Sequence, residues 1–207
     1  MKVNRDMVTR AGLELLNEVG LEQLTLRLLA TKLKIQAPTV YWHFKSKEDL
    51  IDEMATTVLA EGAPQLVPAK NSADWPAWAA AFGGGLRKAL LGYRDGARVV
   101  AGSRLTNTEF MKTMERVGAR LVGEGFTVRQ TVVLLSTIYN YTLSFVMEEQ
   151  AVFPRRTERS PKYDITARKK RLDPKEFPIM RQSGSILFDK FDRRFKEGIE
   201  LILFGAK

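Results

Sequence analysis

The stretch of this chain that most restricts its fold runs from Thr25 to Lys47, TLRLLATKLKIQAPTVYWHFKSK. Its leucines and isoleucine provide apolar positions for a small core, and the Thr25 hydroxyl can cap a helix N-terminus. Pro38 marks the start of a second helix, running to about Phe44, because proline is tolerated in the first helical turn, where no intrahelical N–H is needed. These residues predict two short helices joined by a tight corner.

The second of these helices has side chains suited to the major groove of DNA. Its polar and aromatic residues are Thr39, Tyr41, Trp42 and His43, and Lys45 and Lys47 follow it. Lysine and hydroxyl groups can hold phosphates while the tip of the helix meets base edges. His43 is the only histidine in the chain, and both a phosphate contact and a core position are open to it. We expect this helix to bind double-stranded DNA.

Composition favours an all-α protein of the cytoplasm but says little about DNA. No alternating strand pattern of useful length occurs. The absence of cysteine excludes a disulfide scaffold and suits a reducing compartment. The N-terminus lacks an apolar signal segment, so we expect a cytoplasmic protein. The net charge is +9, but residues 154–207 hold 15 basic and 8 acidic residues, against 8 and 6 in residues 1–50. Overall charge is therefore weak evidence for DNA binding.

The pattern of apolar residues, caps and breakers predicts the remaining elements. We expect helices over residues 4–19, 47–61, 75–86, 108–123, 127–149 and 183–204, and a short helix or turn over 99–103. Residues 62–73 and the basic segment 154–171 are expected to be loops, the second mobile and solvated, with a direct nucleic-acid contact as its alternative. This division predicts a DNA-binding domain over residues 1–50, a connector helix over about 47–61, and a larger domain over 62–207.

Residues 130–147 contain no charged side chain. Six serine, threonine and asparagine residues interrupt the segment, which favours a buried interface helix over a membrane span. The last expected helix is apolar on one face. Together the two helices predict a four-helix interface between two subunits, and completion of a monomer core is the alternative.

Three consecutive glycines, Gly83 to Gly85, lie inside an expected helix. Each costs roughly 1 kcal/mol relative to alanine in a helix interior, so a compensating contact is expected. A kink or close approach that makes room for a ligand is one interpretation. A helix break or a tight contact between helices is the other.

The sequence also resembles a known family. Residues 5–53, and PTVYWHFKSK within them, resemble the DNA-binding domain of the tetracycline-repressor (TetR) family of transcription regulators. ALLGYRDGARVVAGSR (89–104) and YTLSFVMEEQ (141–150) resemble its tetracycline-responsive branch. The resemblance implies a homodimeric, ligand-responsive repressor that binds a palindromic operator and is released by a small hydrophobic molecule, aromatic or polyketide-like. An activator, or a regulator without a small-molecule inducer, is the alternative.

Residue by residue, the resemblance implies which side chains contact the operator. The implied DNA contacts are Arg27, Ala37, Pro38, Thr39, Tyr41, Trp42, His43 and Lys47. Leu26 and Ala37 stand where the tetracycline repressor has polar base-reading residues, which implies a different operator sequence.

The ligand site departs further from the tetracycline-responsive pattern. Val100 replaces the histidine that coordinates the magnesium of the drug chelate, and Phe82 and Leu86 replace polar and aromatic anchors. We therefore expect no metal and no cofactor. The implied pocket is mostly apolar and aromatic, with the alternative that its members are ordinary core. It comprises Phe82, Leu86, Val100, Ser103, Arg104, Phe110, Met114, Thr131, Leu135 and Tyr139.

An enzyme is the competing class of function. The chain has one histidine and no cysteine, and it has no spaced arrangement of nucleophile, acid and base. Glu148 and Glu149 are adjacent carboxylates, but neighbouring helical residues point in different directions and do not share a metal or a proton. We therefore expect a non-enzymatic protein.

Overall fold

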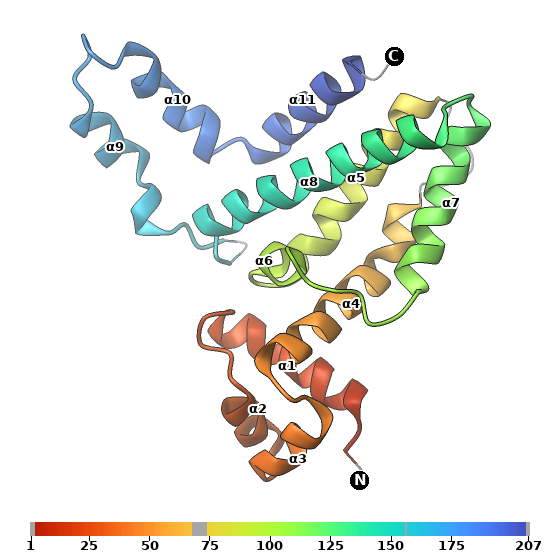
Figure 1. Ribbon diagram of the computed structural model, residues 1–207. Coiled ribbons are helices and arrows are strands. Elements are labelled where there is room, and N and C mark those ends of the chain that lie inside the picture. The colour runs from red at the N-terminus through yellow and green to blue at the C-terminus, as the bar shows by residue number, and fades with distance from the viewer. Residues whose placement is uncertain (1–2, 68–73, 156, 206–207) are drawn as a thin grey trace.

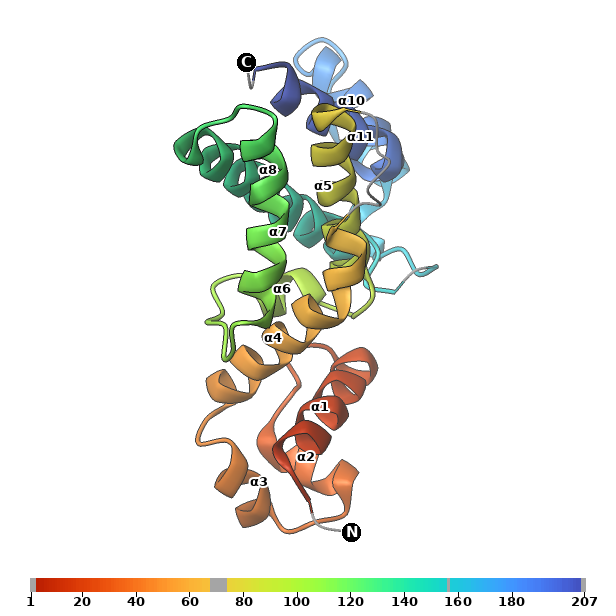
Figure 2. The ribbon, with the colours of Figure 1, turned by 90° about the vertical axis from the view of Figure 1, so that its right-hand side faces the viewer.

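The computed structural model describes residues 3–67, 74–155 and 157–205. Within these ranges every regular element is a helix, which confirms the all-α prediction, and extended backbone pairs only at an isolated bridge between Arg155 and Glu158. Figures 1 and 2 show an elongated molecule with α1, α2 and α3 at one end. Helix α4 leads from them into a body formed by α5 to α8, and α9 to α11 lie beside that body.

The N-terminal unit consists of α1 (Arg5–Val19), α2 (Leu26–Leu33) and α3 (Ala37–His43). The side chains of Asn4 and Thr25 cap α1 and α2 by accepting hydrogen bonds from backbone N–H groups three residues on, as their side-chain chemistry predicts. Lys34 ends α2 in the left-handed conformation at φ 56°, which makes the corner. The two short helices and their tight corner are therefore confirmed.

Helix α4 (Lys47–Leu66) is longer than expected. Ser46 caps its start, but the helix continues through Gly62 and Pro64, so the loop prediction is wrong for residues 62–66. Gly62 is needed there because a Cβ would come within 2.5 Å of the Ala89 Cβ where α4 crosses α5. This packing compensates for two poor helix formers. The rest of the expected loop, residues 68–73, lies outside the described residues.

Helix α5 (Trp75–Leu91) begins where Asp74 caps it and runs unbroken through the three glycines. A Cβ on Gly83 would meet Ile138 and Ile199 at 3.0–3.1 Å, and one on Gly85 would meet the backbone of Gln65 in α4. A Cβ on Gly84 would meet nothing within 4 Å. Tight helix contacts therefore explain the first and third glycines, and the second faces open space.

Three helices follow along the body, α6 (Gly96–Val100), α7 (Glu109–Gly123) and α8 (Val128–Val152). The prediction of a short helix over 99–103 is wrong by three residues. Helix α6 starts at Gly96, directly after Asp95, which adopts a left-handed conformation. The Leu90 carbonyl approaches Gly96 so closely that a Cβ on residue 96 would not fit. Helices α7 and α8 match their predictions closely, and Thr127 and Gln130 form a capping box at the start of α8.

The C-terminal part differs most from expectation. The segment expected as a solvated loop contains a 3₁₀ turn (Pro161–Tyr163) and α9 (Ile165–Arg171), which Asp164 caps. The single helix expected over 183–204 is instead two helices, α10 (Pro178–Phe188) and α11 (Phe191–Phe204). The break falls at Asp189 and Lys190, where Asp189 pairs with the Arg159 guanidinium.

A continuous hydrophobic core runs from the N-terminal unit through the body. Helix α8 contributes buried residues to it along one face and leaves a second face exposed. In the described ranges, no helix combines the length and apolar character needed to cross a membrane.

Candidate nucleic-acid interface and ligand cavities

Helix α3 is anchored on one side and exposed on the other. Val40 and Phe44 are completely buried against α1 and α2, and the Arg5 guanidinium lies 4.1 Å from the centre of the Phe44 ring. The opposite side presents Tyr41, 42% exposed, and Trp42, 74% exposed. Large aromatic side chains in water cost free energy, so a surface of this kind is typical of a binding site.

The structure brings all eight expected DNA-contacting residues to the α2–α3 end of the molecule. The exposed ones are Arg27, Pro38, Tyr41 and Trp42, and the half-buried ones are Ala37, Thr39, His43 and Lys47. The His43 ring packs edge-on against Trp42, 4.7 Å between centroids. The Lys47 ammonium donates a hydrogen bond of 2.7 Å to the Leu21 carbonyl, so in this structure it ties α4 to the end of α1.

Two further residues beside α3 escaped the sequence analysis. Lys34 lies in the corner before the helix, and Gln36 is its N-cap residue without making a side-chain cap. Their position within the three residues before Ala37 is the signal that would have identified them. Both add hydrogen-bond donors next to the exposed face of α3.

Most of the expected ligand-binding residues meet in the core of the body. At most 6% of each of six side chains is exposed, and two more are half-buried against the same core. The six are Phe82, Leu86, Val100, Phe110, Thr131 and Leu135, and the two are Met114 and Tyr139. Ser103 and Arg104 lie outside this group. Arg104 is exposed and pairs with Asp52 of α4 at 3.1 Å, and the Ser103 hydroxyl donates to the Val99 carbonyl.

This core contains polar groups that the described residues leave unsatisfied. The Thr131 and Thr142 hydroxyls are buried on α8, and no described residue is within hydrogen-bonding reach of either. Burial raises the pKa of the nearby Tyr139 phenol by disfavouring its charged form. A buried hydroxyl without a partner costs about 1–3 kcal/mol, so these groups are suited to a ligand that supplies the missing hydrogen bonds.

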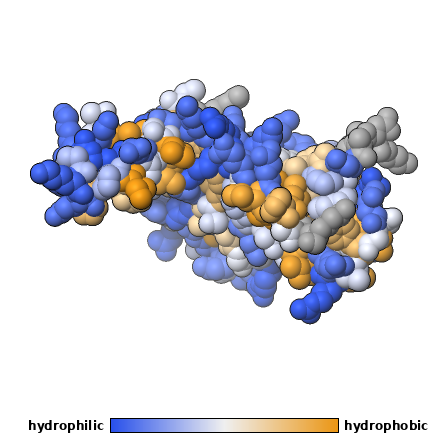
Figure 3. Space-filling view, turned by 90° about the horizontal axis from the view of Figure 1, so that it is seen from above, coloured by the Kyte–Doolittle hydropathy of each residue, from blue (hydrophilic) through white to orange (hydrophobic). Residues whose placement is uncertain are grey.

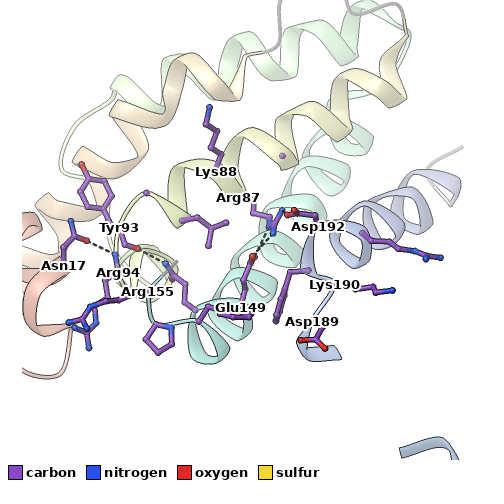
Figure 4. Close-up of a pocket in the computed structure, with 18 residues that line it drawn as sticks. Asn17, Arg87, Lys88, Tyr93, Arg94, Glu149, Arg155, Asp189, Lys190 and Asp192 are labelled. Atoms are coloured by element: carbon purple, nitrogen blue, oxygen red, sulfur yellow. Dashed lines mark hydrogen bonds and ion pairs between the residues drawn. The ribbon is translucent and has the colours of Figure 1, made fainter. Parts of the chain in front are cut away.

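A separate cavity of about 1010 Å³ opens on the side of the body, and we call it the lateral cleft. It lies between the end of α1, the second half of α5, the end of α8 and the α10–α11 corner, and none of the expected ligand residues lines it. Toward the end of the cleft away from α1, Arg87 forms a bidentate ion pair with Glu149, at 2.6 and 2.8 Å, and a second pair with Asp192 at 2.7 Å (Figure 4).

The adjacent carboxylates of α8 bind different arginines. Glu149 pairs with Arg87, whereas Glu148 pairs with Arg194 of α11 at 2.8 Å. The prediction that these two carboxylates diverge is therefore confirmed. Across the described ranges no three carboxylate or imidazole side chains lie close enough together to hold a metal ion.

The N-terminal unit is tied to the body at the α5–α6 corner. The Asp95 carboxylate accepts a hydrogen bond of 2.9 Å from the Leu21 N–H, and the Asn17 side chain accepts one of 2.8 Å from the Arg94 N–H. The sequence analysis did not identify these contacts, because they join residues more than 70 positions apart. These two hydrogen bonds hold the end of α1 against this corner of the body.

Comparison with known proteins assigns the two parts of the chain to families. Residues 8–54 match the family of bacterial regulatory proteins of the tetR type, and residues 67–207 match the tetracyclin repressor-like C-terminal domain. The chain is 41% identical over 150 residues to the tetracycline repressor protein class G of Vibrio anguillarum, covering 72% of this chain and 70% of that protein.

Solved structures show the same fold. A possible TetR family transcriptional regulator from Streptomyces coelicolor A3(2) superimposes with a TM-score of 0.85 at 30% identity, covering 98% of each chain. A variant of TetR from Acinetobacter baumannii AYE, in complex with minocycline, gives 0.75 at 33% identity, covering 99% of this chain and 96% of that one. The chain therefore belongs to the TetR family, whose members are DNA-binding regulators and not enzymes.

Proposed function

We propose that this protein is a homodimeric transcriptional repressor that binds a palindromic operator through α3 and is released by a small hydrophobic molecule. The observation that carries the proposal is the construction of α3, a short helix held from behind by two buried residues with its aromatic and polar face in water. In this proposal residues 1–50 form the DNA-binding domain and residues 62–207 the ligand-binding and dimerisation domain. Its place of action is the bacterial cytoplasm, at the nucleoid.

The proposed DNA contacts divide by chemistry. Pro38 and Thr39, at the start of α3, meet base edges or thymine methyl groups. Tyr41, His43 and Lys47 hold the phosphate backbone, and Lys47 exchanges its hydrogen bond with the Leu21 carbonyl for a phosphate oxygen. The exposed Arg27 of α2 reaches the DNA from the preceding helix. Trp42 adds apolar contact area beside His43.

Dimerisation is proposed to use the uncharged exposed face of α8. Val132, Val133, Ser136, Asn140 and Ser144 follow one another there at helical spacing and are all exposed. Further exposed apolar residues on the C-terminal helices are Ile179, Met180, Ile186, Leu201 and Phe204. Figure 3 shows orange patches on the end of the molecule opposite the N-terminal unit. A second copy that covers them places two α3 helices in one particle, as a palindromic operator of two half-sites requires.

The inducer is proposed to enter the core of the body and to be flat and aromatic, as polyketide-like molecules are. The buried aromatic and aliphatic side chains suit such a molecule, and the unpaired Thr131 hydroxyl offers it a hydrogen bond. A variant of the related Acinetobacter protein was solved in complex with minocycline. Val100 is an alkyl side chain, so the proposed inducer is not a magnesium chelate held by an imidazole at that position.

Release follows from differential affinity. A ligand lowers operator affinity only if it binds the geometry that does not fit DNA better than the geometry that does. Here α4 and the α5–α6 corner connect the core to the N-terminal unit, through Asp52 with Arg104 and through Asp95 with the Leu21 N–H. A change in the packing of α6 around Val100 would therefore move α1 and, with it, α3.

The test is a mobility-shift titration with the DNA upstream of the protein's own gene, repeated over a salt series. A dimer-stoichiometric shift that weakens with salt, with a slope of roughly 0.9 per phosphate contact, and that aromatic drugs release is the expected result. If neither this DNA nor a random operator library is bound at micromolar protein, the proposal is wrong. Binding that no member of a broad drug panel releases would contradict the inducer part alone.

A further inference from the structure

The lateral cleft has an excess of positive charge that its own carboxylates do not neutralise. Its lining includes six arginine and lysine residues but only three carboxylates, Glu149, Asp189 and Asp192. Arg87 binds two of these carboxylates, and Asp189 is paired with Arg159, which lies outside the lining. In the described ranges, the other five cations of the lining therefore have no carboxylate of the cleft as a partner.

Two of those cations converge on one neutral atom. The carbonyl oxygen of Glu18, in the last turn of α1, accepts hydrogen bonds from Arg94 Nη1 at 2.9 Å and from Arg155 Nη2 at 3.4 Å. Among the residues that the structure describes, Arg94 has no carboxylate partner, and Arg155 has only the exposed Glu158. A carbonyl dipole satisfies a guanidinium hydrogen bond but does not cancel two like charges. A carboxylate would do both, and it binds guanidinium groups more strongly.

Part of the cleft wall is apolar. Leu91 of α5 is 39% exposed along it, and the Phe153 and Phe191 rings meet edge-to-face on the other side, 6.0 Å between centroids. Gly84 also borders the cleft, and a Cβ there would meet nothing within 4 Å. Figure 4 shows Asn17, Arg94 and Arg155 at the end of the cleft nearest α1, and Arg87, Glu149 and Asp192 at its other end.

We propose that the lateral cleft binds an amphipathic organic anion, an aromatic carboxylate, at a site separate from the core of the body. The carboxylate bridges Arg94 and Arg155 in place of the Glu18 carbonyl, and the aromatic part lies against Leu91 and Phe153. Binding thereby removes two hydrogen bonds that hold the end of α1 to the body. This site goes beyond the proposed repressor function, and binding to it can be measured without DNA.

The experiment is calorimetric titration of the full-length protein with 2-naphthoate, and with the neutral isostere 2-naphthamide. We expect 2-naphthoate to bind with a Kd below roughly 1 mM and 2-naphthamide at least about tenfold more weakly. Arg155→Gln should weaken naphthoate binding by about tenfold through the loss of one charged hydrogen bond. The matched control is Arg129→Gln, the same change of charge at an exposed arginine near the start of α8, which should leave affinity unchanged.

A second pair of variants tests the location without removing a charge. Leu91→Ala removes the apolar contact proposed for the aromatic part and should weaken naphthoate binding about tenfold. Val122→Ala, at a comparably exposed residue of α7, should leave it unchanged. Amide exchange at residues 17–21 should become faster on naphthoate binding, because the end of α1 loses both arginine contacts.

Each contrary result overturns the proposal. Equal binding of the acid and the amide would show that charge is not recognised. Binding that keeps the parent affinity in both Leu91→Ala and Arg155→Gln would place the ligand elsewhere, in the core. Absence of binding by naphthoate, benzoate and anthracene-2-carboxylate would show that the cleft is not an anion site.

Discussion

Alanine substitutions at two neighbouring glycines of α5 should have opposite effects on stability. A Cβ at position 85 would lie 2.7 Å from the Gln65 carbonyl carbon, closer still to its oxygen, and 3.2 Å from the Leu66 nitrogen. Carbon atoms in contact normally lie about 3.5–4.0 Å apart, and these neighbours are backbone atoms that cannot rotate away. Accommodating Gly85→Ala therefore requires α4 and α5 to separate by about 1 Å.

The magnitude follows from two opposing terms. Overpacking of this kind costs typically about 1–3 kcal/mol, and more where the backbone must shift. Replacing glycine by alanine in a helix interior contributes about 1 kcal/mol of stability in return. Gly84→Ala gains the helix stabilisation without the overpacking cost, because its Cβ meets nothing within 4 Å. Both variants gain the helix term, so their difference in free energy of unfolding equals the overpacking cost. Because the obstructing atoms are backbone, we expect the upper part of that range, about 2–3 kcal/mol.

The assay is thermal unfolding followed by circular dichroism at one fixed protein concentration, since association of subunits makes the midpoint concentration-dependent. For a chain of this size the expected difference corresponds to roughly 4–12 °C in Tm, with Gly84→Ala above the parent protein and Gly85→Ala below it. Equal Tm values for the two variants would show that α4 and α5 do not touch at Gly85. The explanation of the glycine run would then be wrong.

Three further changes test other parts of the structure. Glu149→Gln should lower the free energy of unfolding in urea by about 2 kcal/mol. The cause is that Arg87, which is 14% exposed, keeps only the exposed Asp192 as an ionic partner among the described residues. An unchanged urea midpoint would contradict this. Burial and a 2.6 Å hydrogen bond to Glu61 raise the pKa of Tyr93 to about 12. The contribution of the Tyr93 hydroxyl to folding stability is therefore complete below the unfolded pKa of about 10 and is lost as pH rises toward 12. The stability difference between the parent and Tyr93→Phe should shrink over that interval, and a difference that stays constant would contradict the assignment. Because the Trp42 ring is 74% exposed, Trp42→Ala should change the free energy of unfolding by less than about 0.5 kcal/mol. The same change should weaken operator binding about tenfold in a mobility shift. Unchanged affinity would exclude Trp42 from the interface.

The sequence analysis succeeded where local chemistry determines local structure. Asn4, Thr25, Thr127 and the Trp75-Pro76 pair mark helix starts because capping and first-turn preferences act within three or four residues. The corner between α2 and α3 was placed by the same kind of signal. The resemblance then assigned the family from residues that lie mainly in these well-predicted helices.

The errors occur where a distant contact overrides local preference. Gly62 and Pro64 indicate a loop, but α4 packs against Ala89 and remains helical to Leu66. The periodicity of residues 183–204 indicates one helix, but the pairing of Asp189 with Arg159 coincides with a break at the α10–α11 corner. The charge run in residues 154–171 suggests a solvated loop, yet Asp164 caps a helix within it.

By itself, then, the sequence determined the helical class, most helix starts and the character of α3, because these depend on hydrogen bonds and side chains a few positions apart. Tertiary structure alone decided which charges became partners and where cavities lie. Arg87 meets Glu149 across 62 positions, and Arg94 and Arg155 meet the carbonyl of Glu18 across 76 and 137 positions. Such pairings depend on how whole helices cross, and the crossing is set by the summed packing of the core, which no short segment contains.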